Sequence, residues 1–163
     1  MRIIGIDPGL KSTGWGIIDF TNNKLKHISN GTCKTNEKED ISERLLKIFL
    51  DLTKVFESFS PNSCAIESTF VNKDVAGALK LGQARGVALM TAASAGIKVF
   101  EYAPRLIKKA VTGVGTADKN QVKKMIEFQL PGIIIKSNDA SDAIGVALCH
   151  AFHYNYLKKA EQM

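Results

Sequence analysis

The opening segment of the chain is the sequence feature that most constrains its fold. Residues 2–7 alternate between two faces, and neither face carries a charge between Arg2 and Asp7. A strand that is apolar on both faces is typical of the centre of a sheet that helices cover on both sides. The turn sequence Asp7-Pro8-Gly9 then ends the strand. We therefore expect a covered sheet whose central strand ends in a carboxylate.

Four more strands are expected from the apolar patterns that follow. They are residues 12–20, 25–33, 64–67 and 97–102. Turn residues at Thr21-Asn22-Asn23 separate the first two of these, so together with residues 2–7 they should form a three-stranded meander. The sheet is therefore expected to contain five strands.

Apolar residues at helical spacing predict helices between and after these strands. The expected helices are residues 41–59, 74–95, a short helix beginning at Pro104, 118–129 and 139–157. At the start of the first helix, Asp40 followed by Glu43 resembles a capping box. This order of elements indicates an α/β fold with a mixed sheet and helices on both faces. At 163 residues, the chain should form one domain over 1–163.

Charge and cysteine content limit the partners and the compartment. The 22 Lys and Arg exceed the 16 Asp and Glu, for a formal charge of +6. Nucleic acid is therefore the first candidate partner, although many soluble proteins have a similar excess of surface lysines. Cys33, Cys64 and Cys149 are too far apart to suggest a disulfide framework or a zinc cluster, so a cytoplasmic location is expected. No stretch is apolar enough to predict a membrane span.

Four carboxylates are candidates for a metal site. Asp7 and Glu67 each end an apolar strand, at the sheet edge where ligands usually bind in α/β folds. Asp139 and Asp142 lie three residues apart at the start of the last helix and can share one of its faces. Acids this close need protons or cations to neutralise them. All-oxygen ligands favour Mg²⁺ or Mn²⁺, and two such ions can promote phosphodiester hydrolysis.

Each of these residues also has a purely structural interpretation. Asp7 can be a turn aspartate, Asp139 can cap the last helix, and Asp142 can interact favourably with the helix dipole. Glu67 is harder to explain in this way, because a carboxylate after an apolar strand is costly unless it is paired or metal-bound. His150 and His153 lie one helical turn apart, but without a third ligand they are expected to interact with the dipole at the C-terminal end of the helix.

Five segments resemble, in the same order, motifs of the RuvC crossover junction endodeoxyribonuclease family. The resemblance runs from about residue 3 to 150. Its most specific part is the helix motif around Gly82-Gln83-Ala84-Arg85-Gly86, which is much more specific than the Asp-Pro-Gly turn. The segments are Gly5-Ile6-Asp7-Pro8-Gly9, Thr13-Gly14-Trp15-Gly16, Ala65-Ile66-Glu67, Ala78-Leu79-Lys80-Leu81-Gly82-Gln83-Ala84-Arg85-Gly86 and Asp139-Ala140-Ser141-Asp142-Ala143.

This resemblance implies a ribonuclease H-like α/β fold with a mixed five-stranded sheet. It implies a homodimer that cuts opposed strands of a four-way DNA junction in recombination and repair, leaving 5′-phosphate and 3′-hydroxyl ends. It further implies interaction with the junction-binding protein RuvA and the branch-migration motor RuvB. The matching positions give the metal-binding catalytic acids as Asp7, Glu67, Asp139 and Asp142.

The resemblance also implies roles for three residues outside the acid set. Lys119 and Lys108 match lysines near the cut phosphate, where a cation can hold phosphate or stabilise developing charge. Phe70 matches an aromatic residue that stacks against junction bases. The alternatives are solvated surface lysines and a core phenylalanine.

Two other functions share part of this pattern. An actin-like or sugar-kinase ATPase also begins with a strand, an aspartate and a glycine turn, but it needs two such domains. A catalytically silent nucleic-acid-binding module would share the basic charge, but acids near phosphate weaken binding unless a metal is present. For the expected homodimer, the small-residue helix at 74–95 is the expected contact surface.

Overall fold

The structure is a computed structural model that describes residues 1–68 and 74–160. Within these ranges the chain forms five strands and five helices. The strands are β1 (Arg2–Asp7), β2 (Ser12–Thr21), β3 (Lys24–Lys34), β4 (Ser63–Glu67) and β5 (Val99–Tyr102). The helices are α1 (Ile41–Phe59), α2 (Val75–Ser94), α3 (Pro104–Thr112), α4 (Lys119–Gln129) and α5 (Asn138–Ala160). None of the described helices is long and apolar enough to cross a membrane.

The five strands form one mixed sheet in the order β3-β2-β1-β4-β5. β1, β2 and β3 are antiparallel neighbours, which confirms the predicted meander, and the turn residues Asn22 and Asn23 both have positive φ. β4 runs parallel to β1, and β5 runs parallel to β4. Because β1 and β4 run in the same direction, their C-terminal residues lie at the same end of the sheet.

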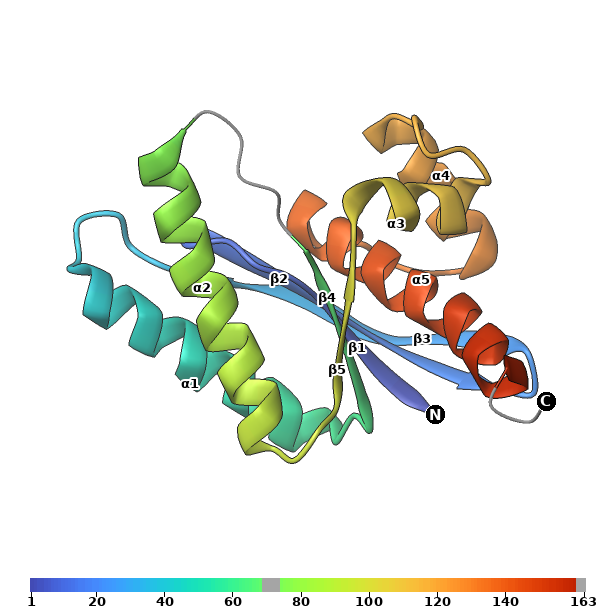
Figure 1. The fold of residues 1–163 in the computed structure, drawn as a ribbon, viewed down its shortest axis with the longest axis horizontal. Helices are drawn as coiled ribbons and strands as arrows, with labels where there is room; N and C mark the ends of the chain where they lie inside the picture. The colour runs from blue at the N-terminus through green and yellow to red at the C-terminus, as the bar shows by residue number, and fades with distance from the viewer. Residues whose placement is uncertain (69–73, 161–163) are drawn as a thin grey trace.

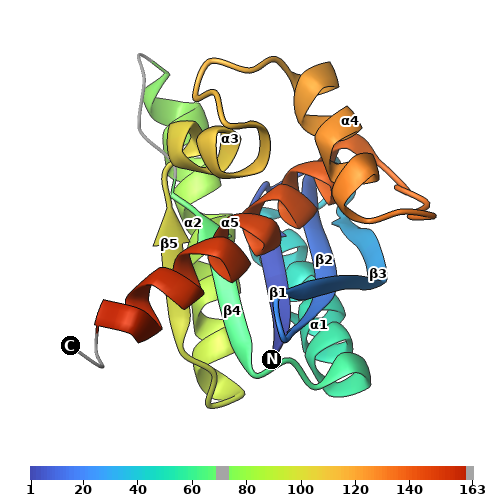
Figure 2. The same ribbon diagram turned by 90° about the vertical axis from the view of Figure 1, so that its right-hand side faces the viewer.

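Helices cover both faces of the sheet, as the apolar pattern of β1 predicts. Figure 1 shows α1 and α2 together on one face and α5 across the other, and the turned view in Figure 2 places α3 and α4 over the end of α5 that begins at Asn138. Ile4 and Ile6 of β1 are buried in the apolar layer formed with α1 and α2. Ile3 is buried in the layer formed with α4 and α5.

Helix α5 lies unusually close to β1 and β2 because glycines face it. A Cβ atom on Gly14 would lie 2.0 Å from the backbone oxygen of Asp139. A Cβ atom on Gly5 would lie 2.0 Å from the backbone oxygen of Ala143. Any larger residue would need the helix backbone to move, so these strands allow one close placement of the first turns of α5.

The predicted capping box at the start of α1 is wrong. Asp40 does occupy the N-cap position, but its side chain makes no capping hydrogen bond. Residue spacing alone does not set the rotamer that such a bond requires. A capping box instead precedes α4, where the Asp118 side chain accepts from the Gln121 backbone N–H and the Gln121 side chain accepts from the Asp118 backbone N–H. This cap fixes the first residue of α4, Lys119.

The expected dipole interaction of the two α5 histidines is also wrong for His150. Its side chain is fully buried in the middle of α5, where one ring nitrogen lies 2.7 Å from Ser63 Oγ of β4 and the other 2.8 Å from Tyr102 Oη of β5. The sequence placed His150 near the C-terminal end of its helix, but α5 spans Asn138–Ala160, and its middle packs on the sheet and buries the ring. Burial lowers the pKa of His150 to about 4, with a smaller contribution from His153.

The buried neutral His150 should make folding stability depend on pH. Unfolded chains take up a proton on histidine near pH 6.5, whereas folded His150 resists protonation until about pH 4. Stability from this residue is therefore complete above pH 6.5 and falls as the pH drops to about 4, by at most about 3 kcal/mol. Urea denaturation across this range should show a shallower fall for His150→Gln than for the wild type. Parallel stability curves would contradict this assignment.

Substitution of Gly14 should displace the start of α5. In Gly14→Ala, the new methyl group meets the Asp139 backbone, so we expect a loss of about 1–3 kcal/mol in unfolding free energy. Gly145→Ala on α5 is the matched control, because its Cβ atom would have its nearest neighbour at 3.5 Å. Urea denaturation should show the control to be at least as stable as the wild type, and equal losses in both variants would refute the close-approach explanation.

Candidate active site

Two of the predicted acids end neighbouring parallel strands. Asp7 is the last residue of β1 and Glu67 the last residue of β4, with Ile6 paired to Ile66 just before them. The Ser68 backbone N–H donates to the Tyr102 carbonyl at 2.9 Å, which keeps the chain beyond β4 attached to β5. The sheet therefore brings Asp7 and Glu67 together across 60 residues of sequence, as their predicted places at strand ends require.

Helix α5 brings the other two acids to the same edge. Ser137 caps this helix, because its Oγ accepts from the Ala140 backbone N–H at 3.0 Å and its carbonyl accepts from the Ser141 N–H at 3.0 Å. The backbone of Asp139 lies against Gly14, which is the strand partner of Asp7. The first turn of α5 is thus placed beside the end of β1, as the sequence predicts.

A cleft of about 360 Å³ contains three of the four acids and both predicted lysines. Helices α3, α4 and α5 supply most of its wall, and the apolar part of that wall was not predicted from the sequence. Pro104 and Ile107 lie three residues apart on α3, and this helical spacing is the sequence signal that could have indicated the apolar wall. The residues that line the cleft are Asp7, Glu67, Pro104, Ile107, Lys108, Lys119, Val122, Asp142 and Gly145.

Asp139 faces an adjoining hollow instead of the main cleft. This hollow lies beside the turn after β1 and is also lined by Lys11 and Lys34. The charge of Asp139 still reaches the main cleft, since it raises the pKa of both Asp7 and Lys119. The structure therefore brings all four predicted acids into one electrostatic cluster, with Asp139 on its far side.

The carboxyl groups of Asp7 and Glu67 are hydrogen-bonded to each other. Burial raises the pKa of the Asp7 carboxyl well above its usual range, and the negative charges of Glu67 and Asp142 raise it further. Burial also raises the pKa of Glu67, while the hydrogen bond from Asp7 lowers it. Both pKa shifts are in the direction expected for carboxyl groups crowded in a desolvated cleft, where a bound cation would offset their negative charge.

Lys119 and Lys108 supply positive charge to the same cleft. Lys119 Nζ donates to Asp142 Oδ2 at 3.1 Å, and this hydrogen bond is the largest cause of the raised pKa of Lys119. Both lysines lower the pKa of Glu67 by their charge. The Lys119 side chain is 77% exposed, so its ammonium group can also reach an anion in the cleft.

The donor chemistry of the cluster fits a hard divalent cation. Every candidate ligand is a carboxylate, and carboxylate oxygens suit Mg²⁺ and Mn²⁺ better than zinc. Among residues 1–68 and 74–160, however, no three His, Cys, Asp or Glu side chains already lie together as ligands of one ion. Asp7 is hydrogen-bonded to Glu67, and Asp142 is hydrogen-bonded to Lys119, so a bound ion would compete with these contacts.

Phe70, the predicted stacking residue, lies outside the described residues.

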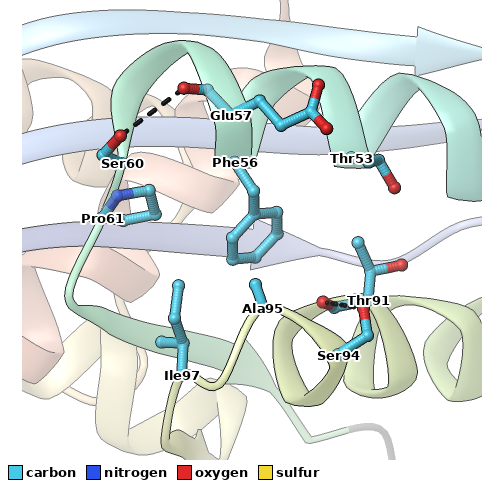
Figure 3. Close-up of a pocket in the computed structure, with 9 residues that line it drawn as sticks. All are labelled: Thr53, Phe56, Glu57, Ser60, Pro61, Thr91, Ser94, Ala95 and Ile97. Atoms are coloured by element: carbon cyan, nitrogen blue, oxygen red, sulfur yellow. Dashed lines mark hydrogen bonds between the residues drawn. The ribbon is translucent and has the colours of Figure 1, made fainter.

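A second cavity, of about 400 Å³, lies at the far ends of α1 and α2 and lacks this chemistry (Figure 3). Glu57 is the one carboxylate that lines it. Its hydroxyl groups are used locally, since Ser60 Oγ donates to the Glu57 carbonyl and Ser94 Oγ donates to the Thr91 carbonyl. The cleft at the strand ends is therefore the candidate active site.

A sheet of this order, with acids at the ends of two parallel strands and at the start of a facing helix, defines a metal-dependent nuclease of the ribonuclease H-like class. The family model described as crossover junction endodeoxyribonuclease RuvC matches residues 3–150. The chain belongs to the RuvC family of crossover junction endodeoxyribonucleases, which confirms the resemblance and the predicted enzyme class.

Individual relatives agree with this assignment over nearly their full length. A crossover junction endodeoxyribonuclease RuvC from Ruegeria pomeroyi is 53% identical over 153 residues, which cover 94% of this chain and 92% of the relative. The protein of the same name from Brucella ovis is 47% identical, covering 100% of this chain and 94% of its own. The structure of Thermus thermophilus RuvC in complex with Holliday junction substrate superposes with a TM-score of 0.89, at 31% identity and 96% coverage of both chains. The predicted fold class is thereby confirmed.

Proposed function

We propose that this chain resolves Holliday junctions in recombination and DNA repair. It would cut two opposed strands of a four-way DNA junction and leave 5′-phosphate and 3′-hydroxyl ends. The observation that carries the proposal is the cleft in which Asp7, Glu67 and Asp142 face Lys108 and Lys119. Carboxylates that gather a cation, set opposite lysines that attract phosphate, suit hydrolysis of a phosphodiester.

The residues that would hold the metal are Asp7, Glu67, Asp139 and Asp142, with Mg²⁺ as the ion, Mn²⁺ able to replace it, and two ions per subunit. When bound, the ions would supply a nucleophile at neutral pH and stabilise the leaving oxygen. Asp7 would bind the metal as a carboxylate, since a carboxylate ligand must be deprotonated. Its position between Glu67 and the start of α5 supports a role for Asp7 as a metal ligand.

The lysines would act on the substrate. Lys119 would leave Asp142 and place its ammonium group beside the cut phosphate, where developing negative charge is greatest. Lys108, on α3 at the same wall, would hold a neighbouring phosphate as a point charge. Phe70 would stack against a junction base beyond β4, following Glu67 by three residues in the sequence.

The chain would act as a homodimer through α2, because two opposed cuts need two active sites. An exposed apolar stripe on this helix supports the proposal. Val75 is 77% exposed, Leu79 65% and Met90 54%. Between them, Gly82 and Gly86 have no atom within 4 Å of an added Cβ, so a second helix could approach closely. RuvA and RuvB would be the protein partners, and the cytoplasm the location.

A junction-cleavage assay tests the proposed function. With Mg²⁺ the protein should nick a synthetic four-way junction, spare linear duplex of the same sequence, and hydrolyse no ATP. Glu67→Gln should still bind the junction but not cut it, because the variant loses one charged ligand with little change of shape. Cleavage that persists under excess chelator would refute the metal mechanism, and cutting by Glu67→Gln at the wild-type rate would refute the site.

Lys119 should act mainly on the transition state. Lys119→Ala should lower the cleavage rate at saturating junction by about 10²-fold, while junction affinity changes little, because its charge meets negative charge that develops only during the reaction. Lys124→Ala is the control, since this nearby α4 lysine does not line the cleft. Single-turnover cleavage and binding titrations would separate the two effects, and equal losses of rate and affinity would mark Lys119 as a binding contact.

The dimer surface can be tested by placing a charge on the stripe. Leu79→Glu should shift the protein from dimer to monomer in sedimentation at micromolar concentration, because an unpaired charge is costly to bury. Phe128→Glu on α4 is the control: it alters a 78% exposed apolar residue on the opposite helical layer. A wild-type monomer, or equal dissociation of both variants, would contradict the proposed surface.

A further inference from the structure

A buried amide on the edge strand holds the segment that leads into α5. Asn30 of β3 is 1% exposed. Its Nδ2 donates to the Ile134 carbonyl at 2.9 Å, and its Oδ1 accepts from the Lys136 backbone N–H at 3.0 Å. One side chain therefore satisfies two backbone groups on the loop after α4, in the way that a neighbouring strand would. We call this two-bond contact the Asn30 clamp.

The orientation of the Asn30 amide is fixed by its partners. A backbone N–H can only donate and a carbonyl oxygen can only accept, so Oδ1 must face Lys136 and Nδ2 must face Ile134. Nδ2 also lies 2.9 Å from Nε2 of His27, which must then accept. Burial lowers the pKa of His27, which favours the neutral ring that this contact needs. His27 thus helps to hold the same amide nitrogen that binds the loop carbonyl.

A β-bulge explains why His27 and Asn30 can meet. Residues three apart in a regular strand point to opposite faces of the sheet. The pairing of β2 with β3 shifts by one residue, from Ile17↔Ser29 to Ile18↔His27, so one extra residue lies between them. Bulges of this kind redirect a side chain. The shift turns His27 and Asn30 to the same face, the one that α5 covers.

The clamp ends immediately before the helix that carries two of the acids. Lys136 precedes Ser137, whose side chain caps α5, and Asp139 follows in the first turn. The Asp139 backbone in turn lies against Gly14. The clamp, the cap and the glycine contact thus fix the start of α5 in consecutive steps.

From this arrangement we infer that Asn30 is a positioning residue of the active site: it sets the first turn of α5 so that Asp139 and Asp142 can bind metal. The inference rests on the proposed function, but its hydrogen-exchange and Mn²⁺-binding tests do not require junction cleavage. Residues that orient metal ligands commonly change metal affinity or activity by about 10- to 100-fold when they are removed. Asn30 should act in this way without touching metal or DNA.

The test compares two variants with a control on the same strand. Asn30→Leu removes both clamp bonds. Asn30→Asp keeps the shape and the acceptor for Lys136 but places an oxygen against the Ile134 carbonyl. Ser29→Ala is the control, because Ser29 pairs with Ile17, whose side chain faces the α1–α2 layer.

Two readouts need no DNA substrate. Hydrogen exchange in metal-free protein should show the Lys136 amide protected in the wild type, Ser29→Ala and Asn30→Asp, and unprotected in Asn30→Leu. Mn²⁺ binding followed by electron paramagnetic resonance should weaken by about 10-fold or more in both Asn30 variants and stay unchanged in the control.

Cleavage supplies the third readout. At saturating junction, both Asn30 variants should lose turnover while KM for the junction stays at the wild-type value. Wild-type Mn²⁺ affinity in both Asn30 variants would overturn the inference, as would a KM that rises in step with lost turnover. Unfolding of both variants would also overturn it, by reducing Asn30 to a general stabilising role. A wild type that fails to cut junctions would refute the proposed function alone, because the exchange and Mn²⁺ readouts would still decide on the clamp.

Discussion

The close contact of α5 with β1 and β2 is the constraint on which the rest of the site depends. Gly5 and Gly14 leave room for the helix backbone itself, so the helix lies nearer to the sheet than side chains would normally allow. Gly14 is also the strand partner of Asp7. A carboxylate at the end of β1 and another in the first turn of α5 therefore become neighbours through backbone contacts, which are more rigid than contacts between loops.

This closeness carries an electrostatic cost that the fold must offset. Burial and mutual repulsion raise the pKa of Asp7 and of Glu67, so the cluster favours any cation that can enter. Two apolar layers, one on each face of the sheet, supply stability without contributing to the site. The cleft is open on the side of Lys119, where an exposed ammonium group already partners Asp142. Electrostatic repulsion of this kind, with raised carboxyl pKa values, is typical of sites that bind metal and phosphate.

Much of the fold followed from local sequence patterns, because those patterns report burial directly. The two-sided apolar run at residues 2–7 predicted a covered central strand, and the structure confirms it. Strand-end positions likewise predicted that Asp7 and Glu67 would meet. The placement of Asp139 in an adjoining hollow was not predictable, since helical spacing gives a shared face but not the angle at which the helix meets the sheet.

Polar contacts between distant residues were the least predictable. The link between Asn30 and the loop spans more than 100 residues of sequence. The contact of His27 with Asn30 depends on a bulge that no local pattern predicted. His150 was predicted near a helix end. It lies instead in the middle of α5, buried against β4 and β5. Side-chain hydrogen bonds depend on the final register of strands and helices, so sequence periodicity contains little information about them.

The Asn30 clamp and the hydrogen bonds of His150 together explain how α5 is held at one position on the sheet. Apolar packing against the sheet resists separation, but it allows a helix to slide or rotate slightly at little cost, because many apolar contacts are interchangeable. Hydrogen bonds are directional, and losing one inside the protein leaves an unpaired polar group. The Asn30 clamp fixes the approach to the helix from the β3 edge, and His150 fixes its middle against Ser63 and Tyr102 on β4 and β5. A helix held toward both edges of the sheet, at β3 and at β4–β5, cannot turn its acids away from the end of β1 without breaking a buried bond. Specificity of position, rather than extra stability, is what these polar groups add to an otherwise apolar interface.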